Sequence, residues 1–310
     1  MYNCLIIGLG NVGMLYDYNT NKIQSHAKAI NFHKQFTLSG AVDVDQKNRM
    51  MFKKKYNKPV FKDIKLALRS VKPEIIIIST PTNSHLKILK QILNNYKPNV
   101  IICEKPLGSS LNQSLDIISL CAKNKIKLYV NFPRLSDPGV IKIKNKILSG
   151  NIKTPISGSV YYSRGTLNNA SHFLNTLEFW CGKIIRLKLL DKGAKFNRFD
   201  FNSSFLVGFK NANFLFIPTK NTNSIELFSK NGRLFYQKGG HKIFWQKILI
   251  NKQYSFKFDK KKQFLPSGKN KSQLHFINNL YNALNKKNNS ICSGKLAIKT
   301  LRIIYSLYEK

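Results

Sequence analysis

The stretch Gly8-Leu9-Gly10-Asn11-Val12-Gly13 follows the apolar run Cys4-Leu5-Ile6-Ile7 near the start of the chain. This order is typical of a strand that ends in a glycine-rich turn, and such turns hold the pyrophosphate of a dinucleotide. Gly8 permits the tight turn, Gly10 lets the phosphates approach the backbone, and Gly13 lets the following helix pack closely. We expect the N-terminal amides of that helix to point at the anion. Because a lone motif of this kind is weak, the interpretation depends on motifs further along the chain.

The composition indicates a globular protein. At 310 residues, 43% hydrophobic and 12% aromatic, the chain is long enough for two domains with cores of their own. Purely apolar runs such as Ile75–Ile78 are far too short to span a bilayer, and Met1-Tyr2-Asn3 leads into the first strand without the regions of a signal peptide. The five cysteines have no metal-ligand spacing. We expect a cytoplasmic protein with no membrane span and no bound metal.

The charge balance is strongly basic. The chain has 52 Lys and Arg against 14 Asp and Glu, a net charge of +38. Such a charge is one sign of a nucleic-acid or membrane partner. The alternative is the amino-acid usage of an AT-rich genome, because Lys, Asn and Ile are abundant along the whole length. We favour this alternative and expect no specific nucleic-acid partner, since no recognition motif accompanies the charge. A basic surface would still favour an anionic substrate.

Up to about residue 130, short apolar runs alternate with helical patterns, which is typical of βαβ units and a parallel sheet. The predicted strands cover residues 2–7, 37–42, 75–79, 100–103 and 127–130. The predicted helices cover residues 25–32, 84–93 and 111–123, with an inserted loop over residues 16–24. The pattern predicts a doubly wound parallel sheet of the Rossmann type over residues 1–128.

The second half of the chain shows a different pattern. Helices are predicted over residues 138–148, 168–180, 272–284 and 294–307, and a strand over residues 156–162. From residue 183 to about 264, short β segments alternate with turn signals, which predicts an antiparallel sheet with one face available for packing. We therefore expect an α+β domain with an open, mostly antiparallel sheet over residues 129–310.

Asp43 ends the second predicted strand. A carboxylate at this place accepts hydrogen bonds from the adenosine ribose and repels a 2′-phosphate, which favours NAD over NADP. The alternative is a simple turn residue or helix cap. Lys47 and Arg49 lie close behind Asp43, so NADP is also left open.

The segment Ser79-Thr80-Pro81-Thr82-Asn83-Ser84-His85 follows a very hydrophobic strand. Open parallel sheets bind their ligands beyond the carboxyl ends of the strands. We therefore expect this segment to form a cofactor-binding loop through Thr80, Pro81, Asn83 and His85. An ordinary strand-to-helix turn is the alternative.

The segment Cys103-Glu104-Lys105-Pro106-Leu107-Gly108 follows the next strand, on the same edge of the sheet. An exposed lysine is usually only solvated, but Lys105 is flanked by Glu104 beside the predicted nicotinamide pocket. Its ammonium there could bind a substrate hydroxyl or carbonyl oxygen and stabilise negative charge that develops on it.

His172 lies in the predicted helix over residues 168–180, four residues after Asn168, so the two would share a helix face. A histidine that titrates near neutrality suits proton transfer to or from a sugar hydroxyl. A hydrogen-bonded structural histidine is the alternative, and the surrounding motifs favour the catalytic interpretation.

Taken together, these segments resemble the Gfo/Idh/MocA family, named for glucose-fructose oxidoreductase and inositol dehydrogenase. The order GLGNVG, Asp43, STPTNSH, CEKPLG and a helix that carries His172 before FWCG matches over nearly the whole chain, and the EKP segment is the most specific piece. The segment GLGNVGMLYD…QSHAKAI is similar to a branch found in bacterial surface-polysaccharide and sugar-nucleotide pathways.

The resemblance implies a Rossmann domain followed by an α/β domain whose open sheet often mediates oligomers, here a dimer or tetramer. It implies that Asn11 and Val12 contribute with the three glycines to cofactor binding. By position, Lys105 is the catalytic lysine, Glu104 lies beside the nicotinamide ribose and His172 transfers the proton. Asn131 and Arg134 fall where the family lines its substrate pocket.

One departure concerns the pattern Asp-x-x-x-His, because Asn168 stands in the position of the aspartate. An amide can orient His172 by accepting a hydrogen bond, but it carries no charge and takes no proton. The sequence therefore predicts an NAD(P)-dependent oxidoreductase that acts on a secondary alcohol or ketone of a sugar or sugar nucleotide. The alternatives are a non-catalytic, sensor-like dinucleotide-binding protein on the same scaffold and, from charge alone, a nucleic-acid-binding protein.

Overall fold

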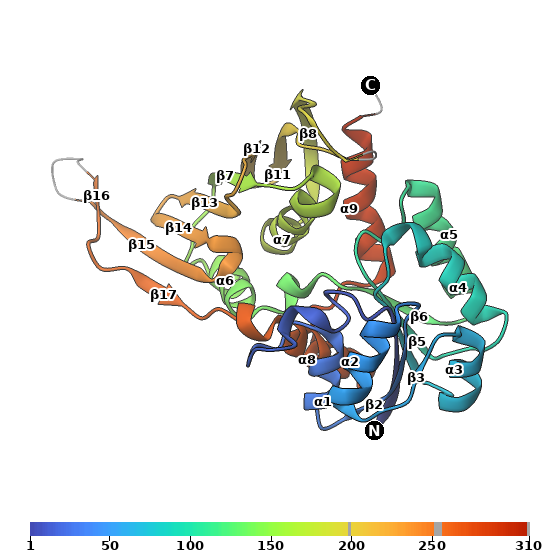
Figure 1. The fold of residues 1–310 in the computed structure, drawn as a ribbon. Helices are drawn as coiled ribbons and strands as arrows, with labels where there is room; N and C mark the ends of the chain where they lie inside the picture. Colours follow the sequence, from blue (N-terminus) through green and yellow to red (C-terminus); the bar gives the residue numbers. More distant parts are fainter. Residues whose placement is uncertain (198–199, 251–255, 309–310) are drawn as a thin grey trace. The chain divides into compact units, whose positions relative to one another are not determined.

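A computed structural model describes residues 1–197, 200–250 and 256–308 of the chain (Figure 1). The chain forms two compact units, one of residues 1–136 with 270–299 and the other of residues 137–269 with 300–310. The domain boundary drawn from the sequence after residue 128 stays a prediction, because compactness is not a test of independent folding.

The first unit is built on a six-stranded parallel sheet with the order β3-β2-β1-β4-β5-β6. The strands are β1 (Tyr2–Ile7), β2 (Phe36–Val42), β3 (Val60–Phe61), β4 (Ile75–Ile78), β5 (Val100–Cys103) and β6 (Lys127–Val130). All four isoleucines of β4 are buried, as expected for a central strand covered on both faces. The order reverses between β1 and β4, and open sheets of this kind bind ligands at that point. The predicted doubly wound parallel sheet is confirmed.

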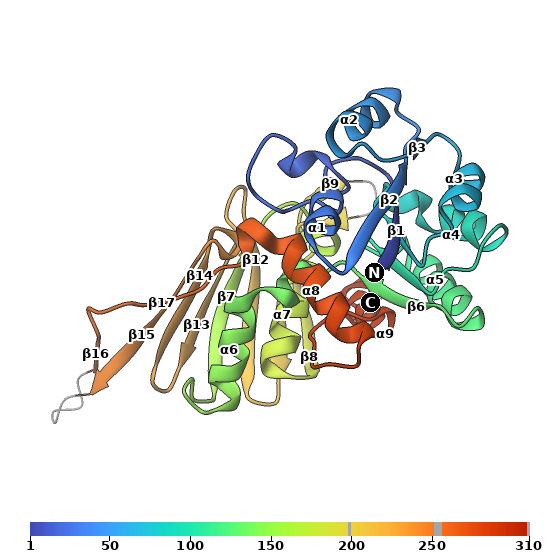
Figure 2. The same cartoon turned by 90° about the horizontal axis from the view of Figure 1, so that it is seen from below.

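Helices cover both faces of this sheet (Figure 2). They are α1 (His26–Phe32), α2 (Gln46–Tyr56), α3 (Ile64–Val71), α4 (His85–Leu93), α5 (Leu111–Lys123) and α8 (Ser272–Leu284). One apolar core joins α1 and α8 to the sheet, with Phe276 and Leu280 of α8 fully buried in it. The sequence patterns missed β3, α2 and α3, because α2 has five basic residues and no apolar stripe and β3 has only two residues.

The α-helix that follows the glycine-rich turn begins only at α1, which agrees with the predicted inserted loop over residues 16–24 and helix over residues 25–32. Met14 N–H donates to the carbonyl of Gly10 at 2.8 Å and closes a single turn. The chain then leaves this turn and returns at α1, whose first amides donate to the turn: His26 N to Val12 O at 2.9 Å and Ala27 N to Gly13 O at 3.0 Å. The predicted inserted loop therefore forms an excursion between the turn of residues 10–14 and α1. The first amides of α1 bind the carbonyls of that turn, as the next residues of a continuous helix would.

A buried carboxylate closes this excursion. Asp17 is fully buried and accepts hydrogen bonds from the backbone of Gln24 at 2.6 Å and from the backbone and hydroxyl of Ser25 at 2.9 and 2.6 Å. Ser25 in turn caps α1 by accepting from Lys28 N–H. Asp17 thus fixes the place at which α1 begins.

The second unit contains a large mixed sheet with the order β16-β15-β14-β13-β7-β12-β11-β8, and β17 pairs with β15. Its main strands are β7 (Ile156–Tyr162), β8 (Ile184–Asp191), β11 (Ser204–Phe209), β12 (Ala212–Pro218), β13 (Ser224–Ser229), β14 (Gly232–Gln237), β15 (Lys242–Ile250), β16 (Phe256–Phe258) and β17 (Gln263–Leu265). The short β9 (Lys195–Asn197) and β10 (Asp200–Phe201) form a separate pair. Residues 198–199 and 251–255 of the predicted antiparallel segment lie outside the described residues.

Neighbouring strands of this sheet are antiparallel except β7 and β12, which are parallel. One face packs against α6 (Pro138–Leu148) and α7 (Ser171–Cys181): the rings of Phe173 and Trp180 lie 6.5 and 6.2 Å from that of Tyr236. The predicted open, mostly antiparallel sheet is therefore confirmed. The last helix, α9 (Gly294–Ser306), begins in the first unit and ends in the second.

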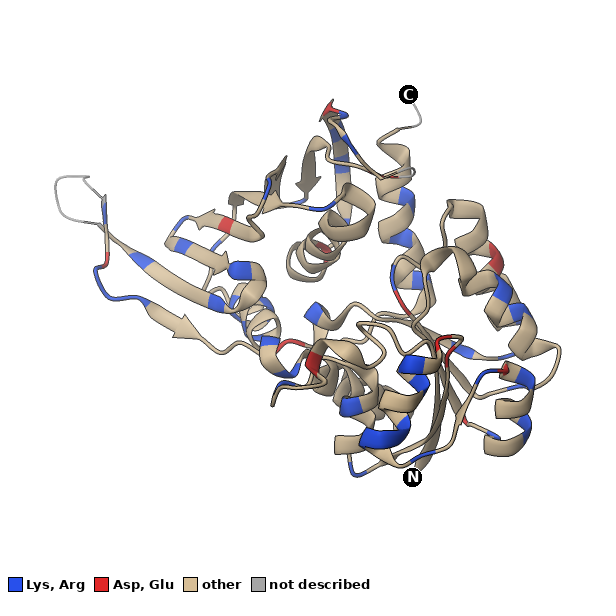
Figure 3. Ribbon diagram, in the orientation of Figure 1, with Lys and Arg blue, Asp and Glu red and all other residues tan. Residues whose placement is uncertain are grey.

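Basic residues occur on the helices and strands of both units (Figure 3). Across the described residues, no helix is both long enough and apolar enough to cross a bilayer.

Asp17→Ala should destabilise the protein by about 3 kcal/mol, because three donors, two of them buried, lose their acceptor. Asp45→Ala is the matched control, since Asp45 is exposed and only caps α2, and its loss should cost about 1 kcal/mol. Urea unfolding monitored by circular dichroism measures both. Equal effects of the two substitutions would contradict the structural role of Asp17.

Candidate functional site

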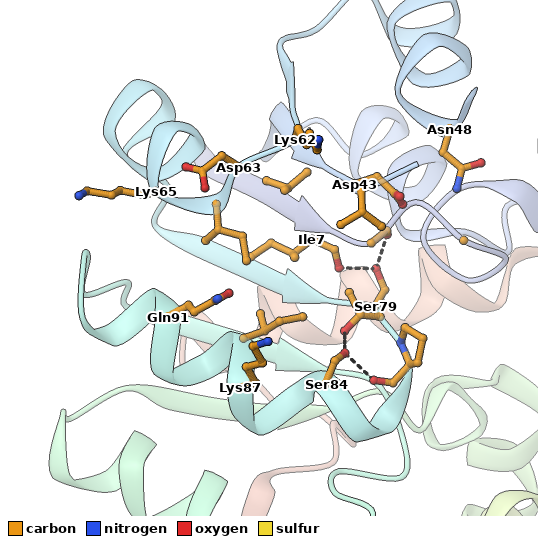
Figure 4. A pocket seen from close by; sticks show the side chains of 18 of the residues that line it. Ile7, Asp43, Asn48, Lys62, Asp63, Lys65, Ser79, Ser84, Lys87 and Gln91 are labelled. Atoms are coloured by element: carbon orange, nitrogen blue, oxygen red, sulfur yellow. Dashed lines mark hydrogen bonds between the residues drawn. The ribbon is translucent and has the colours of Figure 1, made fainter. Parts of the chain in front are cut away.

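The candidate site is a cavity of about 590 Å³ beyond the carboxyl ends of β1, β2 and β4 (Figure 4). Five of the residues predicted to bind a cofactor line it together: Gly8, Gly10, Asp43, Thr80 and Pro81. The cavity lies at the strand ends where the order of the sheet reverses, as expected for a dinucleotide site in a doubly wound fold.

The three glycines of the turn are required for different reasons, which the surroundings of a Cβ at each position show. Gly8 has φ +98°, and a Cβ there would come within 2.8 Å of the backbone of Ser79. A Cβ on Gly13 would lie 2.1 Å from the carbonyl oxygen of Gly8. A Cβ on Gly10 would meet nothing within 4 Å. The protein's own backbone therefore excludes side chains at Gly8 and Gly13, whereas the space beside Gly10 is open to a ligand.

The turn also offers donors to an anion. In the part of the chain that the structure describes, the backbone N–H groups of Gly10, Asn11 and Val12 have no protein acceptor. Successive amides of a turn at the start of a helix bind phosphate oxygens. The residues present therefore fit the pyrophosphate of a dinucleotide.

Asp43 is held beside this turn. Its Oδ2 accepts from Leu9 N–H at 2.5 Å and its Oδ1 from Asp45 N–H at 2.8 Å. Each oxygen keeps a second lone pair, so the carboxylate can still accept from ribose hydroxyls while its charge repels a 2′-phosphate. The Arg49 guanidinium donates to the carbonyls of Asp43 and Val44, both at 2.8 Å.

Basic side chains nevertheless contribute to the lining of the cavity. Lys62, Lys65 and Lys87 belong to its lining (Figure 4). They would attract a phosphate, whereas Asp43 would repel one placed on the ribose. The choice between NAD and NADP therefore depends on whether the 2′ position of the adenosine ribose lies beside Asp43 or beside one of these lysines.

The loop after β4 is fixed by its own side chains. The Ser79 hydroxyl donates to Gly8 O at 2.8 Å, which joins the loop to the glycine-rich turn. His85 is fully buried, and its ring nitrogens lie 2.9 Å from Thr80 O and 3.1 Å from Leu107 O. His85 therefore braces the loops after β4 and β5, and Asn83 lies outside the lining of the cavity. Direct contact of either with a cofactor stays a prediction.

The structure adds a histidine that the sequence reasoning did not assign. His26 is fully buried, and its Nε2 lies 2.7 Å from Glu104 Oε1. Asn131 Nδ2 donates to the same oxygen at 2.6 Å. The segment QSHAKAI was visible as part of the resemblance, but nothing in it shows that residue 26 meets residue 104.

This cluster keeps Glu104 ionised. Burial alone raises the pKa of Glu104, but hydrogen bonding and charge from His26, the Asn131 amide and the charge of Lys105 outweigh it and lower the pKa below its ordinary value. Asn131, placed in the substrate pocket by resemblance, is itself almost fully buried. Substrate contacts of Asn131, of the half-buried Arg134 and of Lys105 stay predictions, as does the position of Glu104 beside the nicotinamide ribose.

His172 and Asn168 lie in the second unit. The prediction of one α-helix over residues 168–180 is wrong in its first turn, because Thr166–Ala170 forms a π-helix and α7 begins at Ser171. The four-residue spacing of Asn168 and His172 is therefore not a simple turn of α-helix. The Asn168 side-chain amide donates to Arg164 O at 2.9 Å.

A buried carboxylate lies beneath this π-helix. Asp200 accepts from Leu167 N–H at 2.8 Å and from Asn168 N–H at 2.9 Å. Burial raises the pKa of Asp200 even though these backbone donors favour its charged form. Residue 168 thus lacks a carboxylate of its own but binds one through its backbone. The roles of Asn168 and His172 in proton transfer stay predictions.

Gly10→Ala should weaken NADH binding about tenfold or more, because the added methyl occupies the space through which the phosphates approach. The melting temperature should stay within about 2 °C of that of the unmodified protein, since the methyl touches no protein atom. Gly13→Ala is the contrasting variant and should lower the melting temperature clearly. NADH fluorescence titration and thermal unfolding measure the two effects. Unchanged NADH affinity in Gly10→Ala would contradict this placement of the pyrophosphate.

Comparison with known proteins agrees with this geometry. Residues 2–132 match the profile of the family described as "Oxidoreductase family, NAD-binding Rossmann fold", Gfo/Idh/MocA. No curated protein sequence matches the chain significantly.

Solved structures share the fold over nearly the whole chain. An NAD-binding oxidoreductase of Klebsiella pneumoniae has a TM-score of 0.78 at 13% identity, covering 99% of this chain and 95% of its own. The WlbA dehydrogenase of Bordetella pertussis, in complex with NADH and UDP-GlcNAcA, has a TM-score of 0.74 at 12% identity, with coverage of 99% and 95%. A super-repressor mutant of Gal80p from Saccharomyces cerevisiae has a TM-score of 0.79 at 13% identity, again with coverage of 99% and 95%.

At these identities the solved structures show a common fold. The predicted resemblance is confirmed over residues 2–132, which match the NAD-binding Rossmann fold of the Gfo/Idh/MocA oxidoreductase family.

Proposed function

We propose that this protein is an NAD(P)-dependent oxidoreductase that transfers hydride between the nicotinamide and a secondary alcohol or ketone of a sugar or sugar nucleotide. The observation that carries the proposal is the cavity at the reversal point of the sheet, with Gly10 open to a ligand and Asp43 beside it. Lys105 follows β5 at the carboxyl end of the same sheet. We propose NAD as the cofactor, because the carboxylate of Asp43 beside the glycine-rich turn favours an unmodified ribose over a 2′-phosphate.

When bound, the nicotinamide supplies the acceptor or donor of hydride. The chain supplies the rest of the chemistry in this proposal. The Lys105 ammonium donates a hydrogen bond to the reacting oxygen and stabilises the negative charge that develops there as the C–H bond breaks. His172 takes the hydroxyl proton during oxidation and returns it during reduction, with Asn168 orienting the ring. Because Asn168 is neutral, the imidazolium form of His172 gains less stabilisation than beside an aspartate.

We further propose an anionic substrate of the sugar-nucleotide class. The WlbA structure holds UDP-GlcNAcA on the same fold, and the net charge of +38 favours a substrate with phosphate or carboxylate groups. In this proposal Arg134 and Asn131 contribute to the substrate pocket. The cytoplasmic location proposed here agrees with five free cysteines.

A second candidate is a non-catalytic sensor of the dinucleotide. It is supported by Asn168 in place of an acid and by the shared fold with Gal80p, whose solved form is a super-repressor. NADH binding without turnover of any sugar nucleotide would favour this candidate over the enzyme.

Lys105→Met should lower kcat at least about 100-fold, because the reacting oxygen loses its charged donor, while the Kd for NADH changes less than about threefold. Lys97→Met is the matched control and should behave like the unmodified protein, since Lys97 is an exposed lysine of the same unit. A panel of UDP- and dTDP-linked sugars, assayed by NADH absorbance with NADPH in parallel, measures turnover. Loss of NADH binding together with turnover would contradict the catalytic assignment of Lys105.

The outer face of the large sheet supports a homo-oligomer, a dimer or tetramer. The strand pairing places Leu206, Leu215, Ser159, Glu226, Phe235, Phe244 and Phe264 in one cross-strand row. Phe264 is 62% exposed at the end of this row. Its neighbour Phe244 stacks on Phe235 with ring centroids 4.9 Å apart. A row that ends in an exposed aromatic ring packed beside a buried aromatic neighbour favours a protein partner, and we propose a second copy of the chain.

Phe264→Glu should shift the oligomer toward the monomer, because a charge placed in an apolar interface loses its hydration. Phe32→Glu is the matched control, since Phe32 is also 62% exposed but lies on α1. Light scattering after gel filtration measures the molar mass. A monomeric unmodified protein, or equal effects of both substitutions, would contradict the proposed interface.

A further inference from the structure

His26 connects the two loops on which the proposed reaction depends. Its backbone N–H donates to Val12 O in the glycine-rich turn at 2.9 Å. Its side chain reaches Glu104, the neighbour of Lys105, at 2.7 Å. A single residue therefore joins the pyrophosphate-binding turn to the loop that carries the lysine.

The position of His26 is itself fixed. Ser25 caps α1 immediately before it, and Asp17 holds Ser25 through hydrogen bonds to its backbone and hydroxyl. The helical turn of residues 10–14 is followed by the inserted loop, and α1 then begins at His26. His26 is therefore the first residue of α1, directly against the glycine-rich turn. The imidazole is fully buried there and has little freedom to choose another partner.

The cluster leaves polar atoms unsatisfied. Within the described residues, His26 Nδ1 and Asn131 Oδ1 are buried and have no hydrogen-bond partner. Each such atom costs free energy that an apolar side chain would not. The cluster is therefore a poor way to gain stability alone, which favours a role in the chemistry of the site.

We propose that His26 is a positioning residue that, through Glu104, fixes the location of the Lys105 ammonium. The inference rests on the proposed function, since it concerns how the lysine of that reaction is held. The hydrogen bonds of His26 and Asn131 to Oε1 lock the carboxylate in one orientation, and the fixed negative charge then orients the neighbouring ammonium.

The ionised state of Glu104 is part of this role. The groups that act on Glu104 come from three elements: His26 from α1, Asn131 after β6, and Lys105 after β5. All three favour the carboxylate, and burial opposes them. Without His26, burial should raise the pKa of Glu104, so that its carboxyl group stays protonated up to a higher pH. In that neutral form Glu104 no longer holds the ammonium by charge.

The experiment compares His26→Leu, which removes the donor, with His26→Gln, whose amide can still donate to Glu104. His33→Leu at the C-terminal end of the same helix is the control. The chain has only five glutamates, so ¹³C NMR of labelled glutamate carboxyls resolves their titrations, and Glu104→Gln assigns the signal. In His26→Leu the midpoint of Glu104 should rise by about one pH unit or more. In His26→Gln the rise should be smaller, and His33→Leu should leave the midpoint unchanged.

The functional readouts use the same variants. In His26→Leu, kcat should fall on the order of tenfold or more, with KM for NAD changed less than about threefold. His26→Gln should recover most of kcat although its melting temperature need not recover. An unchanged Glu104 midpoint or an unchanged kcat in His26→Leu would overturn the proposal. So would a loss of activity that follows only the melting temperature.

Failure of the proposed function gives a different result. The unmodified protein would then bind NADH but turn over no sugar nucleotide. The carboxyl titration and the fluorescence of bound NADH still test the positioning in that case. His26→Leu should change the emission of the bound nicotinamide, and His26→Gln should not. Identical NADH emission and identical Glu104 titration midpoints in all variants would contradict the inference about His26 and leave the proposed function untouched.

Discussion

The site depends on the close approach of two backbone segments, the turn after β1 and the loop after β4. Gly8 adopts φ +98° and leaves no room for a side chain against Ser79, while the Ser79 hydroxyl donates to Gly8 O. Gly13 lies against the same carbonyl group. This contact brings the ends of the two central strands together and directs the open side of Gly10 into the cavity. Asp43 then completes the turn by accepting from Leu9 N–H.

The excursion between the turn and α1 determines how the first helix of this unit is made. In a continuous helix the turn would be stabilised by the residues that follow it directly. Here the carbonyls of Val12 and Gly13 receive their donors from His26 and Ala27 instead. The buried side chain of Asp17 stabilises the longer connection by accepting hydrogen bonds from the backbone and hydroxyl of Ser25. The same arrangement places an imidazole beside Glu104, so the insertion and the lysine loop form one connected structure.

In the second unit, too, a carboxylate from a distant segment binds the backbone of a segment important to the proposed reaction. Asn168 cannot provide a negative charge, yet the carboxylate of Asp200 meets its backbone N–H beneath the π-helix. The π-helix also widens the turn before α7, which places the residues ahead of His172 differently from those of a regular helix. Both departures lie in the segment where the proposed proton transfer occurs. They explain why the spacing of Asn168 and His172 in the sequence is a poor guide to their geometry.

Much of the fold follows from local sequence patterns. The alternation of apolar strands and helices determined the parallel sheet, and turn signals between short β segments determined the antiparallel one. The glycine spacing, Asp43 and the residues after β4 indicated where the candidate cavity lies, because motifs at the carboxyl ends of parallel strands lie on one edge of a sheet. Elements without a clear pattern, such as the basic helix α2 and the two-residue strand β3, were missed.

Contacts between segments far apart in the chain could not be read from local patterns. The pairing of His26 with Glu104 joins residues 78 positions apart, and Asn131 reaches the same carboxylate from a third segment. Likewise, α8 comes late in the sequence but packs in the core of the first unit. Sequence patterns report the periodicity of single elements, whereas these contacts depend on the order of the strands and the side chains that burial brings together. Local sequence patterns therefore specified the fold class and the strand ends that line the candidate cavity, whereas the packing of distant segments specifies which charged groups hold the neighbouring loops in position.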